Sequence, residues 1–377
     1  MNPACRMCRF VLPLLLLLAG MSALAQQGIT RTNVVLGQSV ALTGAASALA
    51  APFHQGAKLY FDRVNAAGGV NGRRIELVTL DDRGDVQNTV ANTRALLNKG
   101  VFALFGYYGS PQVMAAYPLI KESDVLLFAP MAAADELRGA LYENVYSIRP
   151  GYSEEAAAIA RHAEALGARR LAIVHATDHE SLAALDGATR TMTAMGSNLV
   201  SSVELKKKAG GQSPIDKVLA ARPESILVIG TATEAAQAVR LLRANGFRGT
   251  VYGFSNTGES LLADELGSAG GGVVIVRVVP KSDALKIPVV RDLIADASAA
   301  KAGKPNVYML EGYLAARSFC EALQQITKEP TRVRLKKVLM ALEDRDLGGF
   351  RLNFTGDRGG SRLVELGMID SSGRMRD

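Results

Sequence analysis

Short strands rich in β-branched residues alternate with amphipathic helices along most of the chain, and the alternation begins twice. The strand candidates of the two halves lie at 34–40, 74–80, 101–105, 125–129, 170–174, 225–229 and 251–254. Strands that are connected through helices run parallel and are covered on both faces. The pattern therefore predicts an α/β fold, and 377 residues, 48% of them apolar, are enough for two such cores.

The two halves also share a local pattern, in which an apolar strand is followed by Gly, a small hydroxyl residue that opens a helix, and a second strand. The first half reads VFALFGYYGSPQVMAAYPLIKESDVLLFAP and the second reads SILVIGTATEAAQAVRLLRANGFRGTVYGFS. We expect two lobes of one architecture rather than a tandem array. No linker rich in Pro, Ser and Gly separates the halves, so we expect strands that cross between the lobes to join them. Further strand candidates at 350–354 and 364–369 end the chain.

The first 25 residues are typical of an export signal. Two arginines precede the apolar stretch 10–19, and Ala23-Leu24-Ala25 has the small-x-small pattern that signal peptidase recognises. The apolar stretch is shorter than a membrane span, and no Cys follows it at a lipoprotein position. We therefore expect cleavage after Ala25 and a periplasmic mature protein.

Export also changes how the charge and the cysteines are interpreted. The full chain has 43 Lys and Arg against 36 Asp and Glu, and two of the arginines lie in the signal. The only basic run is 206–208, without interleaved aromatic residues, so a nucleic-acid partner is not expected. Of the three cysteines only Cys320 lies outside the signal, which excludes an intramolecular disulfide in the mature chain.

Ser110 is the strongest candidate for a ligand-binding residue. It follows the strand 101–105 through a Gly-Tyr-Tyr-Gly turn, and Pro111 suits the first position of a helix. In doubly wound sheets, ligands bind at the carboxyl ends of strands, where a hydroxyl and the free N–H groups of a helix start can hold a carboxylate. The alternative is that Ser110 only caps its helix. The local sequence favours neither.

No motif for catalysis or cofactor binding is present. The patterns G-x-S-x-G, G-x-G-x-x-G, the P-loop and H-E-x-x-H do not occur. His175 and His179, with Asp178 and Glu180 beside them, could suggest a metal cluster, but they are predicted at a strand end and in the following loop, where a structural or surface role is favoured. The sequence therefore predicts a protein without cofactor, metal or enzymatic activity.

One stretch, Asn-x-x-Gly-Gly-Val-Asn-Gly at 65–72, followed by Asp81-Asp82 at a strand end, is fairly specific. With it, the chain resembles the type I periplasmic solute-binding proteins of ABC importers, in the branched-chain amino-acid (leucine/isoleucine/valine) class. The resemblance spans about 30–370, and its other stretches are 42–44, 56–57, 101–110, 129–130, 169–175 and 241–246. It implies two doubly wound parallel-sheet lobes, joined by three crossover strands, that close on a ligand like a hinged clamp.

The resemblance also implies where the lobes begin and end. After a signal at 1–25, the first lobe would contain 29–149 and 279–345, and the second lobe 150–278 and 346–377.

By the same resemblance, Ser110 and the turn Met131-Ala132-Ala133 would hold a ligand carboxylate from the first lobe. Tyr152, just past the first crossover, would wall the cleft from the second lobe.

The resemblance places three further residues at the cleft. Thr231, parallel in sequence to Ser110, would face the ligand from the second lobe, while Leu49 and Tyr108 would shape the apolar side. For each of these residues, ordinary packing or capping is the alternative.

Departures from the family pattern leave the identity of the ligand open. Ala133 stands where amino-acid binders often have a hydroxyl, and the loop 253–256, which includes Ser255, lacks the usual acidic partner for a ligand ammonium. Glu180-Ser181 replaces an aromatic-Gly pair. A buried ammonium needs a carboxylate or several acceptors; Glu180 would supply one, or would be a solvated loop residue. An α-amino acid, a non-amino carboxylate and an amide are all open.

The resemblance predicts the substrate-binding component of an ABC importer, a monomer that closes on a small amino acid or organic acid and delivers it to permease subunits in the inner membrane. Ligand contacts to both lobes would shift the equilibrium towards the closed form. One alternative is a sensor of the same fold that signals occupancy to a receptor. The other is a secreted α/β enzyme, which would need a nucleophile and a base in the cleft.

Overall fold

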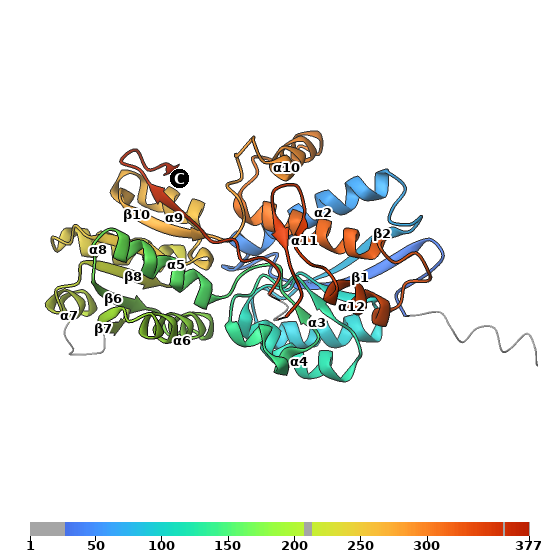
Figure 1. Ribbon diagram of the computed structural model, residues 1–377, viewed down its shortest axis with the longest axis horizontal. Helices are drawn as coiled ribbons and strands as arrows, with labels where there is room; N and C mark the ends of the chain where they lie inside the picture. Colours follow the sequence, from blue (N-terminus) through green and yellow to red (C-terminus); the bar gives the residue numbers. More distant parts are fainter. Residues whose placement is uncertain (1–26, 207–212, 357–358, 377) are drawn as a thin grey trace, which may run out of the picture.

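The computed structural model describes residues 27–206, 213–356 and 359–376. The predicted export signal lies outside the described residues. The described chain forms two α/β lobes that lie side by side, each built on its own parallel-dominated sheet (Figure 1). The fold class predicted from the alternation of strands and helices is confirmed. None of the helices in the described ranges has both the length and the apolarity to cross a bilayer.

The first lobe contains a five-stranded sheet in the order β2-β1-β3-β4-β5, in which all neighbouring strands are parallel. Its strands are β1 (Asn33–Val40), β2 (Arg74–Asp81), β3 (Ala103–Phe105), β4 (Leu127–Phe128) and β5 (Val145–Tyr146). The central strand β3 is buried along its whole length, as expected for a strand with helices on both faces.

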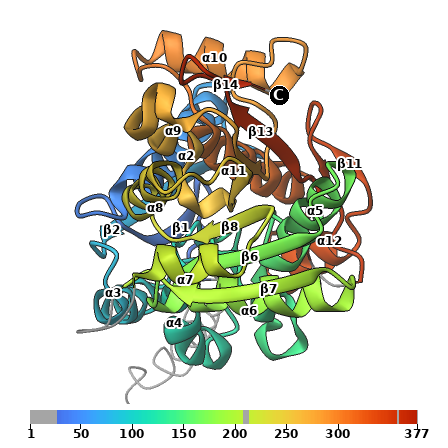
Figure 2. The same ribbon diagram turned by 90° about the vertical axis from the view of Figure 1, so that its left-hand side faces the viewer.

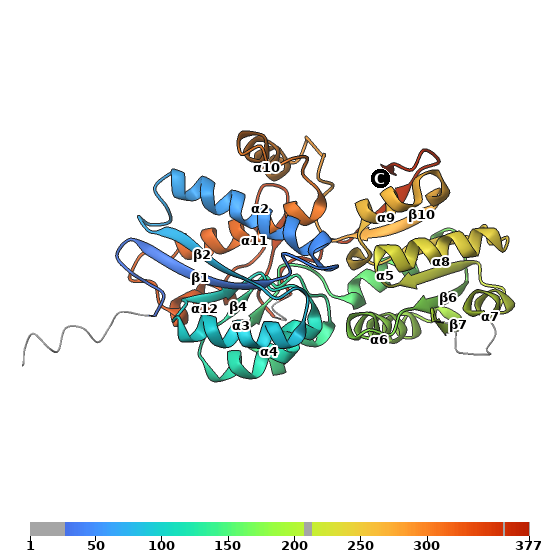
Figure 3. The ribbon, with the colours of Figure 1, turned by 180° about the vertical axis from the view of Figure 1, so that it is seen from behind.

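Helices from two distant parts of the chain cover this sheet. They are α2 (Ser47–Ala66), α3 (Val86–Asn98), α4 (Ser110–Glu122), α10 (Pro288–Ala299), α11 (Val307–Gln324) and α12 (Arg332–Met340). Two 3₁₀ turns, η3 (Asp135–Arg138) and η4 (Ala140–Tyr142), precede β5, and a hairpin of β11 (Arg345–Asp346) and β12 (Arg351–Leu352) follows α12. Helices α2 and α11 lie together on one side of the sheet, and α3 and α4 on the other (Figures 1 and 3).

Helices α2 and α11 approach each other so closely that both need glycine where they touch. A Cβ atom on Gly56 would lie 1.8 Å from the carbonyl oxygen of Met309, and one on Gly312 would lie 1.8 Å from the carbonyl oxygen of Phe53. Because both obstacles are backbone atoms, a side chain at either position would push the helices apart.

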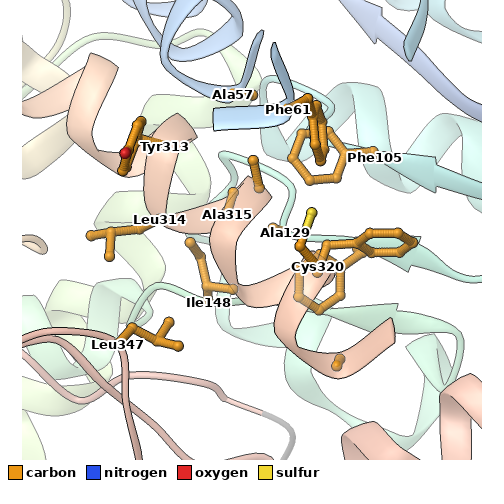
Figure 4. Packing of buried hydrophobic residues seen from close by; sticks show 14 of the residues in the cluster. Ala57, Phe61, Phe105, Ala129, Ile148, Tyr313, Leu314, Ala315, Cys320 and Leu347 are labelled. Atoms are coloured by element: carbon orange, nitrogen blue, oxygen red, sulfur yellow. The ribbon is translucent and has the colours of Figure 1, made fainter. Parts of the chain in front are cut away.

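The core of the first lobe is rich in aromatic rings. Phe105 packs against Phe61, Phe128 and Phe319, with ring centroids 5.3, 6.4 and 6.3 Å apart. Cys320 lies in the same cluster (Figure 4), and burial raises the pKa of its thiol well above the usual value. A buried thiol of this kind behaves as a small apolar residue.

The second lobe contains a seven-stranded sheet in the order β14-β13-β10-β9-β8-β6-β7 (Figure 2). Its strands are β6 (Arg170–His175), β7 (Asn198–Glu204), β8 (Ser225–Ile229), β9 (Thr250–Gly253), β10 (Val273–Arg277), β13 (Glu365–Ile369) and β14 (Met375–Arg376). The strands from β6 to β10 are parallel, whereas β13 and β14 are antiparallel to their neighbours.

Helices pack on both faces of the second sheet. They are α5 (Tyr152–Ala165), α6 (His179–Ala194), α7 (Pro214–Ala220), α8 (Ala232–Ala244) and α9 (Glu259–Leu266), with the 3₁₀ turns η5 (Ser255–Thr257) and η6 (Gly267–Gly270). Alternate residues of β6 divide between two cores: Leu171 and Ile173 pack with α5 and α6, and Ala172 and Val174 pack with α7, α8 and α9. This division follows the two-residue period of a strand.

The chain crosses between the lobes three times, from β5 to α5, from β10 to α10 and from β12 to β13. The exact lobe limits stay a prediction. The side chains of Phe350, Leu352 and Phe354 pack in the core of the first lobe. We therefore propose to place the third boundary after Phe354 instead of after residue 345.

Candidate functional site

Ser110 lies where β3 ends and α4 begins, at the carboxyl edge of the first sheet. Gly106 and Gly109 have φ angles of +59° and +92°, which allow the chain to turn from strand to helix within four residues. Gly109 is the N-cap residue, and the hydrogen bonds described for the Ser110 side chain join it to Glu180 and Ala134 instead of to α4. The Ser110 hydroxyl instead accepts a hydrogen bond from the backbone N–H of Ala134, 3.1 Å away, which leaves its own proton free to be donated.

The carboxylate of Glu180, from the second lobe, lies against these donors. The backbone N–H of Ser110 donates to Glu180 Oε2 at 2.6 Å, and Ser110 Oγ donates to Glu180 Oε1 at 2.8 Å. The hydroxyl of Tyr152 donates to the same Oε1 at 2.5 Å. Three donors, drawn from both lobes, thus hold one carboxylate.

Two helix N-termini meet at this carboxylate. Ser110 opens α4, and Glu180 lies in the first turn of α6, which Asp178 caps by accepting a hydrogen bond from the N–H of Ser181 at 3.0 Å. The N-terminus of a helix carries partial positive charge and favours an anion. Burial and the Glu180 charge raise the pKa of Tyr152 well above its usual value, so the phenol stays protonated and can donate. Glu180 is therefore part of the interface between the lobes and not a solvated loop residue.

The turn at 131–133 lies beside Ser110 and contributes backbone groups. Met131 forms an isolated parallel bridge with Tyr108, and its carbonyl accepts from the N–H of Gly109 at 3.1 Å. The carbonyl of Ala133 accepts from the N–H of Tyr152 at 3.0 Å, across the lobe boundary. All three residues of the turn, Ala132 included, are buried.

A second polar group surrounds Arg149, at the first crossing. Its guanidinium lies 3.5 Å from Glu311 Oε1 on α11 and 3.4 Å from Glu155 Oε1 on α5, and it donates to the hydroxyl of Ser255. The backbone N–H and the hydroxyl of Ser255 donate to Glu155, each at 2.8 Å. All four side chains are buried.

The positive charge of Arg149 stabilises the two buried carboxylates of this second group. Burial raises the pKa values of Glu155 and Glu311, and the attraction of Arg149 opposes both shifts. Within the described part of the chain, Arg149 Nε, Glu311 Oε1 and Asn256 Oδ1 are buried without a hydrogen-bond partner. Such groups cost about 1–3 kcal/mol each when they stay unpaired. Of these three residues, Glu311 lines a small cavity at the lobe boundary, together with Ser255.

Three predicted residues have no described side-chain hydrogen bond to either group. Leu49 is buried and faces the second lobe, because a Cβ on Gly258 would lie 3.4 Å from Leu49 Cδ2. Tyr108 is half-buried, and burial and the Glu180 charge raise the pKa of its phenol. Thr231 is exposed, and the hydrogen bonds described for its side chain all join it to Glu234, in a capping box at the start of α8. The contact of each residue with a ligand stays a prediction.

The structure corrects the setting of the histidines. His179 is the first residue of α6 and not part of a loop, while His175 is buried at the end of β6, with its Nδ1 2.8 Å from the carbonyl oxygen of Ala176. Within the described ranges no three potential metal ligands come together.

Arg149, Glu155 and Glu311 were not predicted as site residues, and neither was Asp135, whose Oδ2 lies 3.4 Å from Nη2 of Arg190 in the second lobe. Charged residues in amphipathic helices are normally exposed, so the pattern of α5 gave no reason to bury Glu155. The sequence does indicate that Glu311 is unusual, because it is the only charged residue in the apolar stretch 307–316 at the start of α11. Asp135 precedes Arg138 in the short turn η3, which the sequence did not predict.

Comparisons with known proteins agree with the two-lobed fold. Residues 33–374 match the family model described as periplasmic binding protein. The chain is similar to an amino acid binding protein from Pseudomonas aeruginosa (24% identity, covering 77% of this chain and 78% of the relative) and to a leucine-specific-binding protein from Salmonella typhimurium (25% identity, 81% and 83%). The crystal structure of a substrate-binding periplasmic protein from Ralstonia solanacearum superposes with a TM-score of 0.81 at 28% identity, covering 91% of this chain and 99% of that one.

Proposed function

Because the chain belongs to the periplasmic binding protein family, we propose that it is the substrate-binding component of an ABC importer. The family and the relatives are binding proteins, so the chain is a binding protein and not an enzyme. In this proposal the protein acts in the periplasm as a monomer, binds a small amino acid or another small carboxylate or amide between its lobes, and delivers it to permease subunits.

The observation that carries the proposal is the way in which Ser110 holds a carboxylate. Its N–H and hydroxyl donate to two different oxygens of Glu180, at the N-terminus of α4 and at the edge of the lobe. Charge-assisted hydrogen bonds of this kind are about twice as strong as neutral ones. The same donors would hold the carboxylate of a solute that entered between the separated lobes.

The group around Arg149 supports a polar solute. It places a guanidinium and two carboxylates in the boundary between the lobes, and it comprises residues from both lobes. A solute with donors and acceptors of its own would bind there better than a hydrocarbon, because buried polar groups need partners. This favours amino acids, hydroxy acids and amides among small molecules.

A thermal-shift screen of the purified protein tests the proposal. Amino acids, aromatic acids, short-chain carboxylates and their amides would be compared at millimolar concentration, and calorimetry would follow for each hit. A ligand at a hundred times its Kd stabilises by about 2.7 kcal/mol, which is readily detected as a higher unfolding temperature. The hits would be recovered unchanged after long incubation. A panel without a hit, or a hit that the protein consumes, would contradict the proposal.

A further inference from the structure

Glu180 takes the place that the proposed function gives to the carboxylate of a solute, and it does so from the opposite lobe. We propose that Glu180 is an internal competitor: its carboxylate holds the lobes closed in the absence of solute, and a solute carboxylate must displace it from Ser110. The second half of this inference rests on the proposed function. The first half concerns the protein alone and can be tested without a ligand.

The Glu180–Ser110 contact joins the two lobes through two hydrogen bonds, one from a backbone N–H and one from a side-chain hydroxyl. The N–H of Ser110 belongs to the backbone of α4, and the hydroxyl of Ser110 is oriented by the N–H of Ala134. On the other side, Tyr152 fixes Glu180 from within its own lobe. The carboxylate is thus oriented by the second lobe and bound by the first.

One face of α6 extends the contact along the lobe boundary. Glu180, Ala183, Gly187 and Arg190 lie three, four and three residues apart, a spacing that places them on the same side of a helix. Ala183 packs against the apolar cluster of the first lobe that includes Ala132. Helices α4 and α6 lie next to each other in two opposite views (Figures 1 and 3).

The remainder of this face contacts Asp135 of the first lobe. Arg190 lies 3.4 Å from Asp135 Oδ2, and a Cβ on Gly187 would lie 2.8 Å from the same oxygen. Asp135 also accepts hydrogen bonds from the N–H and the hydroxyl of Ser153, at 3.2 and 2.6 Å. Glycine is unfavourable inside a helix, and here it allows the two lobes to touch.

A small cavity lies at the lobe boundary next to the buried group around Arg149, because Ser255 and Glu311 of that group line it. The cavity lined by Ser255, Tyr308, Glu311 and their neighbours measures about 10 Å³, which suits a single water molecule. A solute with several heavy atoms does not fit this cavity unless the lobes separate, and separation breaks the Glu180–Ser110 bonds. Because Glu180 is tethered to the same molecule, it competes at high effective concentration.

Small-angle X-ray scattering of the solute-free protein tests the inference, with Glu180→Ala as the main variant. Glu164→Ala is the matched control, because Glu164 is an exposed glutamate on α5 of the same lobe. We expect the wild type and Glu164→Ala to scatter as the closed structure, and Glu180→Ala to have a larger radius of gyration. Glu180→Gln keeps the side-chain volume, loses the charge and should open in the same direction. If circular dichroism shows that Glu180→Ala is misfolded, Glu180→Gln takes its place in the experiment.

Acetate provides a direct test of the competition. Added to Glu180→Ala, acetate should bind at Ser110 and restore the smaller radius, whereas acetamide, of similar shape but uncharged, should not. The wild type should not respond to acetate in the range that saturates the variant, because Glu180 weakens acetate binding by about tenfold or more.

Two results would overturn the inference: an open solute-free wild type, or a Glu180→Ala variant as compact as the wild type. Neither depends on whether the ligand screen finds a solute, so a failure here is distinct from a failure of the proposed function.

Discussion

Arg149 and Glu311 form a buried ion pair at the lobe boundary, with Nη1 of the arginine 3.5 Å from Oε1 of the glutamate. Arg149 lies at the first crossing between the lobes. Glu311 lies on α11, which follows the second crossing, back into the first lobe. The pair, with Glu155 as its third member, therefore connects segments that are far apart in the sequence.

Arg149→Met should be strongly destabilising. It removes the cation and leaves Glu155 and Glu311 buried without their charge partner, a change that typically costs about 3–5 kcal/mol. Urea unfolding followed by circular dichroism would measure the loss. The control is Arg351→Met, because Arg351 pairs with Asp344 on the surface, where such pairs contribute up to about 1 kcal/mol. Equal losses for both variants would refute the role of Arg149.

In a Glu180→Ala background, where no internal carboxylate occupies these donors, Ser110→Ala should weaken the binding of a carboxylate solute by about 1–3 kcal/mol, since it removes one hydrogen bond to a charged group. Titration calorimetry with a carboxylate hit from the screen would measure the change. Ser123→Ala is the control, because it removes a serine hydroxyl from the opposite end of α4, where that hydroxyl donates to the carbonyl of Ile120 at 2.9 Å. An unchanged affinity in Ser110→Ala would remove Ser110 from the site.

Gly187→Ala should weaken the contact between the lobes without destabilising helix α6. The new Cβ would lie 2.8 Å from Oδ2 of Asp135 in the first lobe, so it should disturb the contact between the lobes; it would also lie 2.9 Å from Cβ of Tyr152, on α5 of its own lobe. Alanine is nevertheless the better helix former by about 1 kcal/mol, so α6 itself should not unfold. We expect a larger radius of gyration with far-ultraviolet circular dichroism unchanged. Leu182→Ala, at an exposed position of α6, should alter neither, and a compact Gly187→Ala variant would contradict the expected contact.

Asp81 should contribute to stability in a pH-dependent manner. Partial burial opposes its ionisation, but hydrogen bonds from the Thr43 hydroxyl and the N–H groups of Arg83, Leu42 and Thr43 outweigh it and lower the pKa of Asp81 from 3.8 to about 2. A carboxyl group with a lowered pKa stabilises the fold above its unfolded pKa, and this stabilisation is lost as the pH falls through the folded value. The difference in unfolding free energy between the wild type and Asp81→Asn should therefore be constant near neutral pH and shrink between about pH 4 and 2. A difference independent of pH would argue against this role.

The alternation of strands and helices was sufficient to predict the fold class, because the two-residue and 3.6-residue periods are local properties of a sequence. It did not predict that Phe350 and Phe354 flank a two-residue strand of a hairpin in the first lobe, because burial of that segment depends on a core built from distant residues. The antiparallel direction of β13 is likewise set by the third crossing and not by its own residues.

For the site, local sequence located Ser110 correctly at a helix start, and its counterpart Thr231 also lies at a helix start, where it caps α8. Thr231 is followed three residues later by Glu234, the signature of a capping box, whereas Ser110 is followed by Val113. That difference could have separated the two residues from sequence alone. The contact of Ser110 with Glu180 could not have been found in this way, because it joins residues 70 positions apart on different lobes.

The three crossings also determine the order in which the protein can fold. The first lobe needs α10, α11 and α12, and the sheet of the second lobe needs β13, which pairs with β10 almost a hundred residues earlier in the chain. Neither lobe is complete until residues near the C-terminus have been made, so the lobes cannot mature one after the other during synthesis. Pairings over such sequence distances are slow to form. We therefore expect each lobe to reach its final packing later than a domain built from one continuous segment would.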